Sequence, residues 1–246
     1  MLIKILKFVL YPVLHIIKKI RIVIYKNTSP DFYREYLKIN TSAYKLYKQE
    51  QELKNYNYFK KFFKSSIFLD IKTIRKFALQ KAIANDLDKK KFYLEFGVFD
   101  GASINFFAGI LKNKIYGFDS FEGLNESWEH NLKGAYDLGG KDPYIKANVS
   151  LVKGLVQDTV PKFLSDKKPA INFVHMDLDT YESTKFVLDK IKPYLVKKSI
   201  IIFDQIYNHT GWEEGELKAL TEIFDENEYK YLSFAKDGCQ AVIEIS

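Results

Sequence analysis

The fold is decided by residues 91–119, which read KFYLEFGVFDGASINFFAGILKNKIYGFD. The apolar runs 91–96 and 114–118 have the length and composition of short buried strands, and residues 101–112 between them have the composition of a helix. A strand, a helix and a second strand in this order predict neighbouring parallel strands with the helix packed on the sheet.

The same alternation continues to the end of the chain. Further strands are predicted at 149–154, 171–176, 199–204, 228–234 and 239–245, with helices at 181–194 and 213–225. This pattern predicts a doubly wound, mostly parallel, Rossmann-like α/β domain over residues 71–246. Ligands of such a domain bind outside the carboxyl ends of the strands, so the polar residues that follow each strand are the candidate site residues.

Residues 1–70 are predicted to form a helical appendage to this domain. Residues 1–26 are apolar and basic, but their longest run without a charge, 8–17, has about half of the roughly 20 residues that span a bilayer. Two interpretations stay open: a helix that packs on the domain or on a partner subunit, and an interfacial helix whose lysines contact anionic lipid. We expect packing, in a cytoplasmic homo-oligomer, with peripheral contact at the inner face of the membrane as the alternative.

The net charge of +7 comes almost entirely from Lys, because the only arginines are Arg21, Arg34 and Arg75, and we expect none of them in the catalytic part. Arg is the residue that recognises base edges and phosphates with paired hydrogen bonds, so the charge does not indicate a nucleic-acid partner. The abundance of Lys, Ile, Asn, Phe and Tyr indicates AT-rich coding, hence a bacterial source. The single cysteine, Cys239, leaves no intrachain disulfide and is expected to be a buried thiol.

The first polar cluster follows the first strand of the domain and reads EFGVFDGAS, residues 95–103. Gly97 and Gly101 let the backbone approach a ligand closely and let the following helix point its amino end at it. The spacing differs from the three-glycine pattern of a dinucleotide site, which argues against a dehydrogenase. Glu95 favours a cationic or amine-bearing ligand, and a tight turn without a ligand is the alternative.

The second polar cluster follows the next strand and reads GFDSFEG, residues 117–123. Asp119 ends that strand, where a carboxylate can accept hydrogen bonds from both ribose hydroxyls of an adenosine. A helix cap is the alternative for a lone Asp at this place.

Taken together, six blocks that follow one another in order resemble a known family. The domain is similar to the macrocin O-methyltransferase-like family of class I methyltransferases in EFGVFDGAS, YGFDSFEGL, the stretch from Trp128 through KGAYDLGGK, VKGLVQDTVP, HMDLDTYEST and FDQIYNHTGWEEGE. The resemblance runs from about Lys91 to the C-terminus and leaves out the first 70 residues.

The resemblance implies a seven-stranded sheet whose last strand is antiparallel, with S-adenosylmethionine at the first two turns between strand and helix. Members of the family methylate sugar hydroxyls, often with a bound Mg²⁺, and residues 121–148 would be a mobile cover over the substrate. The implied cofactor contacts are Glu95 and Gly97 at the methionine part, Asp119 and Ser120 at the ribose, Gly154 and Gln157 at the adenine, and Asp177.

An alcohol is a poor nucleophile at neutral pH, so methylation of a hydroxyl needs a base or a Lewis acid. Asp177, Asp204 and Gln205 follow two strands and offer the hard oxygen ligands that Mg²⁺ prefers. At Gln205 the family more often has an acidic residue. Its neutral amide keeps an oxygen ligand but removes a charge, which puts the use of a metal in question.

Asp179 is the predicted catalytic base by analogy with the family, although Asp179 and Glu182 also fit the pattern of a helix capping box. His209, in the turn after a later strand, is a rival base. His175 is expected to point into the packing of its own strand. Three further residues are predicted contacts of a sugar face: Trp128, Trp212 and Glu213.

These features predict an S-adenosylmethionine-dependent O-methyltransferase that acts on the hydroxyl of a nucleotide-activated or glycan-bound sugar, in the synthesis of a bacterial surface polysaccharide. One alternative is methylation of another small hydroxylated metabolite. Another is a membrane-docked glycan-assembly protein that binds S-adenosylmethionine without turnover, and the intact set of carboxylates argues against it.

Overall fold

The computed structural model describes residues 42–124, 131–139 and 141–246. The chain divides into two compact units, Met1–Gln51 and Glu52–Ser246, and the second contains the whole sheet. The predicted segment 1–26 lies outside the described residues. None of the described helices is long and apolar enough to cross a membrane.

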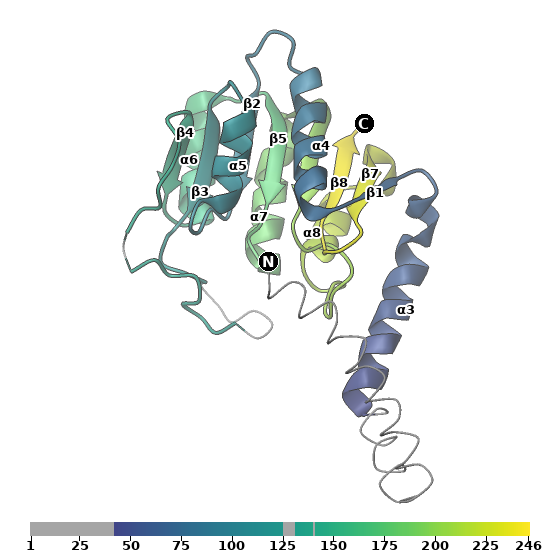
Figure 1. The fold of residues 1–246 in the computed structure, drawn as a ribbon. Helices are drawn as coiled ribbons and strands as arrows, with labels where there is room; N and C mark the ends of the chain where they lie inside the picture. The colour runs from purple at the N-terminus through teal and green to yellow at the C-terminus, as the bar shows by residue number, and fades with distance from the viewer. Residues whose placement is uncertain (1–41, 125–130, 140) are drawn as a thin grey trace, which may run out of the picture. The chain divides into compact units, whose positions relative to one another are not determined.

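The elements alternate between strand and helix as predicted (Figure 1). Their order is α3 (Ala43–Phe63), β1 (Ile67–Leu69), α4 (Ile71–Ala84), β2 (Phe92–Phe96), α5 (Ala102–Ile110), β3 (Ile115–Asp119), β4 (Val149–Lys153), α6 (Val156–Lys167), β5 (Ile171–Met176), α7 (Tyr181–Ile191), a 3₁₀ turn (Lys192–Tyr194), β6 (Leu195–Phe203), α8 (Glu216–Ile223), a 3₁₀ turn (Glu226–Glu228), β7 (Tyr229–Ala235) and β8 (Ala241–Ile245).

One sheet of eight strands, in the order β1-β7-β8-β6-β5-β2-β3-β4, organises the second unit. All neighbouring pairs are parallel except those of β8, which runs antiparallel to β6 and β7. The doubly wound α/β fold and its antiparallel last strand are thereby confirmed. The described sheet has one strand more than the seven expected, because the three residues of β1 add to the edge beside β7. These three residues lie at the end of the stretch predicted to be a helical appendage, residues 1–70.

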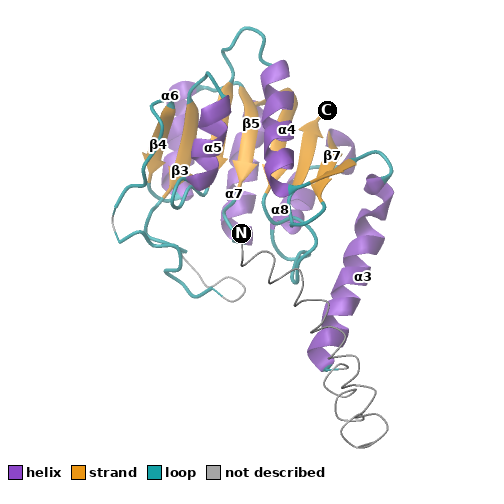
Figure 2. Ribbon diagram, viewed as in Figure 1, coloured by secondary structure: helices purple, strands orange, loops and turns teal. Residues whose placement is uncertain are grey.

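Helices cover both faces of the sheet, as Figure 2 shows. Alternate residues of each central strand enter different clusters, so that Leu94 packs with α6, α7 and α8 while Tyr93 packs with α4 and α5. Strands that are buried on both sides read as continuous apolar runs, which is why the central strands were recognisable. Helix α6 was not predicted, since Pro161 lies in its interior and proline disfavours that position.

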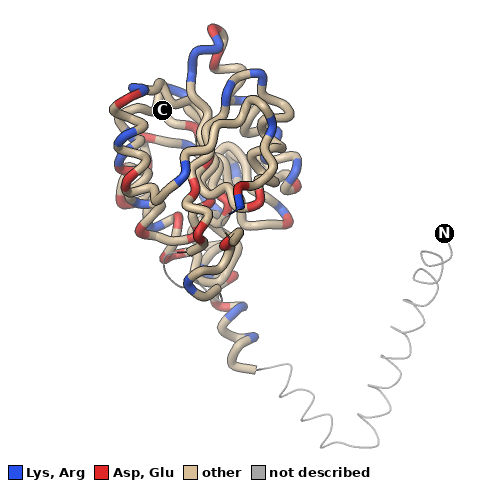
Figure 3. Tube along the Cα trace, turned by 90° about the vertical axis from the view of Figure 1, so that its left-hand side faces the viewer, with Lys and Arg blue, Asp and Glu red and all other residues tan. Residues whose placement is uncertain are grey.

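Local signals set the ends of the helices near the sheet's carboxyl edge. Asp70 caps α4 by accepting a hydrogen bond from the amide of Thr73 at 3.0 Å. Helix α5 starts after Gly101, whose left-handed φ of +81° turns the chain out of β2 and into the helix. In the view of Figure 3, Lys and Arg positions alternate with Asp and Glu positions along the described chain.

Candidate functional site

A cavity of about 360 Å³ lies at the carboxyl ends of the parallel strands. Small-molecule sites have volumes of about 300–1,000 Å³. The strand order reverses here, because β2 pairs with β3 on one side and with β5 on the other, and doubly wound sheets bind ligands at such a place. The lining has two parts: a glycine half of residues 97–100, 119–120 and 154–157, and a carboxylate half of Arg75 and residues 177–180 and 204–205.

Gly97 lies where the two halves meet. Its φ is +86°, and a Cβ added there would lie 1.7 Å from the carbonyl oxygen of Asp177, so no other residue fits without a backbone shift. The amide of Gly97 donates to the carbonyl of Phe118 at 3.0 Å, and the amide of Asp177 donates to that of Phe96 at 2.9 Å. The close approach at this glycine is therefore to a neighbouring strand, and it fixes the loop after β2 in the cavity wall.

Asp119 holds two loops of the glycine half together. Its Oδ2 accepts hydrogen bonds from the amides of Val98 and Phe99, each at 2.8 Å, and its Oδ1 accepts one from the amide of Phe121 at 2.7 Å. Asp119 also lines the cavity, so a ligand hydroxyl can reach it, although three of the roughly four lone-pair positions of a carboxylate are used. The helix-cap alternative does not describe this residue, because it ends β3.

Most of the residues predicted to contact the cofactor do line the cavity. Ser120, Gly154 and Gln157 lie in the wall beside Asp119, and the amide of Gly154 donates to the carbonyl of Asp119 at 3.0 Å. Glu95 is the exception, because it is fully buried and absent from the lining. The roles of these residues stay predictions.

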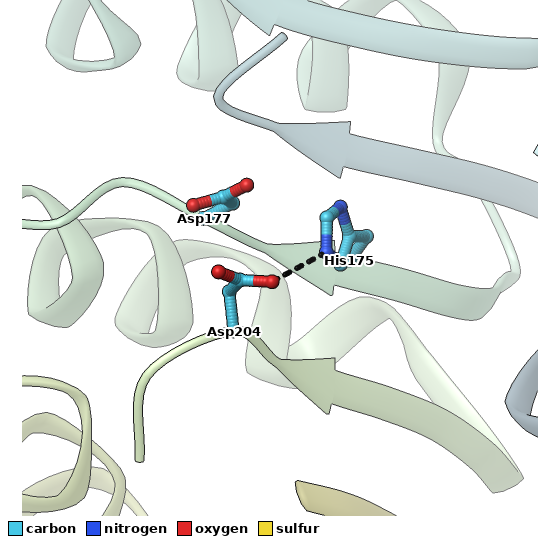
Figure 4. A group of neighbouring side chains, drawn as sticks. All are labelled: His175, Asp177 and Asp204. Carbon is cyan, nitrogen blue, oxygen red and sulfur yellow. Dashed lines mark ion pairs between the residues drawn. The ribbon is translucent and has the colours of Figure 1, made fainter. Parts of the chain in front are cut away.

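Two carboxylates and a histidine meet at the ends of β5 and β6 (Figure 4). One ligand-type atom from each of His175, Asp177 and Asp204 lies within 4.8 Å of the other two. Asp204 Oδ1 accepts a hydrogen bond from Arg75 Nη2 at 3.0 Å and another from the side-chain amide of Gln240. Burial works against the charge of Asp204, but His175, Arg75 and Gln240 outweigh it and lower its pKa. Burial and the charge of Asp204 raise the pKa of Asp177.

His175 was expected to serve only the packing of its strand, but the structure places it between two carboxylates. It is fully buried, with Nδ1 3.5 Å from Glu95 Oε2 and Nε2 3.7 Å from Asp204 Oδ1. Burial disfavours its charged form, but contact with Asp204 and Glu95 prevails and raises the pKa of His175 to about 10. Glu95 in turn accepts a hydrogen bond from the hydroxyl of Ser103 at 2.6 Å. The imidazolium therefore connects the carboxylate half of the cavity to the start of α5.

Asp179 faces the cavity from the loop between β5 and α7. Its φ of +60° is left-handed, which is uncommon for a residue other than glycine. The N-cap of α7 is Thr180 rather than Asp179, so the capping-box interpretation is wrong. Backbone conformations of this kind cost about 1–3 kcal/mol and cluster at functional sites.

Other predicted contacts lie away from the cavity. His209 is outside its lining, with Nδ1 2.9 Å from the carbonyl oxygen of Thr210 and Nε2 3.0 Å from that of Gln205. Trp212 is buried in the core, where its ring lies 5.6 Å from that of Phe59, so the predicted sugar contact is not found there. Glu213 is exposed and does not line the cavity. Trp128 lies outside the described residues.

Three residues of the site were missed, and two of them left a signal in the sequence. Glu95 interrupts the apolar run of β2, and His175 interrupts that of β5. The two residues are paired in the register of these neighbouring strands. Arg75 stands on the apolar stripe of α4 with Ala78, Leu79 and Ala82, which are buried, at a spacing that puts a lone cation against the sheet. Gln240 precedes β8 and had no such signal.

The donors of the carboxylate half suit a hard divalent cation. Asp177 is partly buried and lines the cavity, and Gln205 lines the same wall. With Asp204 they offer carboxylate and amide oxygens, the ligand chemistry of Mg²⁺. A cation there would also relieve the repulsion that raises the pKa of Asp177. His175 lies in the same cluster as the two carboxylates.

Residues 94–206 match the family model described as a methyltransferase domain. That range begins within β2 and ends just after β6, so it contains the ends of all five strands that line the cavity. The chain carries a class I S-adenosylmethionine-dependent methyltransferase domain. Arg75 on α4 and Gln240 before β8 lie outside the matched range, although both contact Asp204 at the wall of the cavity.

Two solved structures of one methyltransferase are similar to this chain. The structure of CalS11, a calicheamicin methyltransferase, aligns with a TM-score of 0.58 and 25% identity over 68% of this chain and 77% of that one. The apo structure of CalS11, described as a TDP-rhamnose 3′-O-methyltransferase, aligns with a TM-score of 0.52 and 27% identity over the same shares. Among curated protein sequences, none matches this chain.

Proposed function

We propose that this methyltransferase transfers its methyl group to the hydroxyl of a sugar, with a nucleotide-activated sugar as the favoured form. The observation that carries the proposal is the position of Asp179, a carboxylate in a left-handed backbone conformation at the cavity wall, two residues after Asp177. The similarity to CalS11, which acts on TDP-rhamnose, supports a sugar as the acceptor. The narrower resemblance to the macrocin O-methyltransferase-like family agrees with it.

In this proposal S-adenosylmethionine supplies a methyl group activated by a sulfonium. Asp179 accepts the proton of the acceptor hydroxyl as its oxygen bonds to the methyl carbon and the carbon–sulfur bond breaks, which leaves S-adenosylhomocysteine. A positioned base of this kind contributes about 10²- to 10⁴-fold to a rate. Asp119 and the loop after β2 orient the nucleoside part in the glycine half. The methyl group then lies toward the carboxylate half, where Asp179 can receive the proton.

Asp177, Asp204 and Gln205 would hold a divalent cation in the carboxylate half. When bound, Mg²⁺ would lower the pKa of a hydroxyl that it contacts. Arg75 and Gln240 both bond the Oδ1 of Asp204, so they fix the direction of its carboxylate whether or not an ion is present. His175 holds the same carboxylate from the other side, at 3.7 Å.

Two aromatic side chains at the cavity are candidate sugar contacts in place of the buried Trp212, while Trp128, outside the described residues, stays a prediction. Phe99 and Tyr136 line the cavity, each about 40% exposed, with ring centroids 5.3 Å apart in an edge-to-face arrangement. Both have a left-handed backbone, with φ values of +46° and +68°. Tyr136 belongs to the predicted cover, residues 121–148. An aromatic pair of this kind suits the apolar face of a sugar ring.

The decisive experiment is incubation with labelled S-adenosylmethionine and a panel of nucleotide sugars that includes TDP-rhamnose. We expect one methyl group on one sugar, with mass spectrometry locating it on an oxygen. Transfer only to hydroxylated metabolites without a sugar would favour the alternative acceptor class. Binding of S-adenosylmethionine with no transfer to any acceptor would favour the non-catalytic alternative. A role in bacterial surface-polysaccharide synthesis stays a prediction.

A further inference from the structure

Arg75 is the only basic residue among the described residues that line the cavity. Five aspartates line the same cavity: Asp100, Asp119, Asp177, Asp179 and Asp204. An acidic wall attracts a sulfonium and an amine, but it repels any carboxylate that enters with them. S-adenosylmethionine carries all three groups, since its methionine part ends in an α-amine and an α-carboxylate. The cavity therefore needs one place where a carboxylate meets a cation, and Arg75 is the candidate.

The structure shows how Arg75 is held. It projects from the second turn of α4 with 23% of its side chain exposed, and Nη2 donates to Asp204 Oδ1 at 3.0 Å. Its Nε is buried and has no hydrogen-bond partner among the described residues. A guanidinium offers five N–H donors in a planar fork that matches a carboxylate. Most of this donor capacity is thus unused among the described residues.

Asp204 does not depend on Arg75 alone. The same oxygen accepts a hydrogen bond from Gln240, and Nε2 of His175 lies 3.7 Å away. Asp204 therefore keeps the hydrogen bond from Gln240 when the guanidinium of Arg75 also binds a ligand. A ligand in the cavity would meet Arg75 rather than His175, because Arg75 lines the cavity while His175 is fully buried.

We propose that Arg75 binds the α-carboxylate of the methionine part of S-adenosylmethionine, while it keeps its bond to Asp204. The inference rests on the methyltransferase domain and is independent of the acceptor. It assigns the cofactor's direction: the adenosine lies in the glycine half beside Asp119, and the amino-acid end points to the carboxylate half. One ligand then explains both observations on Arg75, its Nε without a partner among the described residues and its position in the cavity lining.

The test compares two ligands that differ only in the carboxylate. S-adenosylhomocysteine has it, and S-adenosyl-3-thiopropylamine, its decarboxylated analogue, does not. Calorimetry with Arg75→Met should show binding of S-adenosylhomocysteine weakened about 10- to 100-fold, as expected for charge-assisted hydrogen bonds, and binding of the analogue not weakened. The wild-type protein should bind S-adenosylhomocysteine more tightly than the analogue, and this preference should disappear in Arg75→Met. The four affinities form a double-mutant cycle that isolates the contact between Arg75 and the carboxylate.

Equal weakening of both ligands would show that Arg75 acts through the shape of the site, and unchanged binding of S-adenosylhomocysteine would remove it from the site; either result overturns the proposal. Arg75→Lys gives a second measurement if the Met variant unfolds, because it keeps a charge beside Asp204 but loses the fork. A smaller loss for S-adenosylhomocysteine alone is then expected. Failure to methylate any sugar would leave this comparison of ligands unaffected, so the two proposals fail separately.

Discussion

The two halves of the cavity are built by different means. The glycine half is shaped by the main chain. Gly97 and Gly154 have positive φ values, and the carboxylate of Asp119 accepts hydrogen bonds from three backbone amides. The carboxylate half is shaped by side chains, with Arg75, Asp177 and Asp204 drawn from three elements far apart in the sequence. Substitutions that add atoms should clash with the wall built by the main chain. Substitutions that change a charge should alter the wall built by side chains.

This difference indicates a division of labour in the methyl transfer. A rigid main-chain cradle suits a cofactor that is the same in every turnover. Charged side chains with shifted pKa values, such as Asp177 and His175, are typical of the part where chemistry occurs. Substitution of Asp179 or of the proposed metal ligands should therefore change turnover. Substitutions in the glycine half should change cofactor binding and folding, and Arg75 is the one residue of the carboxylate half whose substitution should change cofactor binding.

The largest effect is expected from Asp179→Asn, which removes the proposed base and keeps the size of the side chain. Asn tolerates the left-handed φ of +60° at this position as well as Asp does. Turnover should fall by about 10²- to 10⁴-fold, while calorimetry with S-adenosylhomocysteine shows unchanged binding. Retained turnover in the folded variant would transfer the role of base to another group. An equal loss of affinity for S-adenosylhomocysteine would show that Asp179 contributes to cofactor binding rather than to proton transfer.

Gly97→Ala should have the next largest effect, on stability. The new Cβ would lie 1.7 Å from the carbonyl oxygen of Asp177 at a φ of +86°. We expect a loss of about 3–4 kcal/mol in the free energy of unfolding, from overpacking and the left-handed backbone together. Denaturant unfolding monitored by circular dichroism measures it.

Gly211→Ala is the matched control, because Gly211 has nearly the same φ, +84°, and no atom within 4 Å of its added Cβ. Its cost should be only that of the left-handed backbone, about 1–2 kcal/mol. Equal costs for the two variants would show that the contact with Asp177 is not rigid, and the description of the glycine half as a fixed cradle would be wrong.

Asp119→Ala should reduce the affinity for S-adenosylhomocysteine by about 1.5–3 kcal/mol, the range of charge-assisted hydrogen bonds. The structure adds a second cause to the predicted loss of ribose contacts, since the amides of Val98, Phe99 and Phe121 lose their acceptor. Calorimetry and thermal unfolding on the same samples separate the two. Lower stability with unchanged affinity would show that Asp119 only holds the two loops together and does not contact the ribose.

The sequence revealed the main-chain half of the site more fully than the side-chain half. Glycines after apolar runs mark turns at strand ends, because few other residues can adopt the backbone that they need, and Gly97 was predicted in this way, whereas Gly154 was implied by the family resemblance. Asp177 and Asp204 were predicted because each directly follows a strand, and Gln205 because it is next to Asp204. The strand order and the pairing of Glu95 with His175 needed the structure, since register depends on contacts between segments far apart in the chain.

The errors have physical causes as well. Trp212 looked like a sugar contact because it follows the last parallel strand, but the aromatic side chains of α3 give it a better site in the core, 5.5 Å from Tyr58. Strand β1 was missed because three residues show no periodicity. Arg75 was set aside because composition was judged over the whole chain, and one cation on an apolar helix stripe is a local feature.

The smallest effect is expected from removing divalent metal. Exhaustive chelation should lower turnover several-fold, and Mg²⁺ should restore it, because Gln205 gives the site one negative charge fewer than a third carboxylate would and Arg75 already compensates Asp204. Gln205→Glu sharpens the test: metal affinity depends on the charge of the ligands, so Mn²⁺ should bind about tenfold more tightly or better in this variant than in the wild type. Electron paramagnetic resonance of free Mn²⁺ measures that affinity without any acceptor. If neither protein binds Mn²⁺ and chelation leaves turnover intact, no metal takes part and the carboxylate half acts through Asp179 and its other charged side chains. The two halves then differ in the charge of their side chains and not in metal binding.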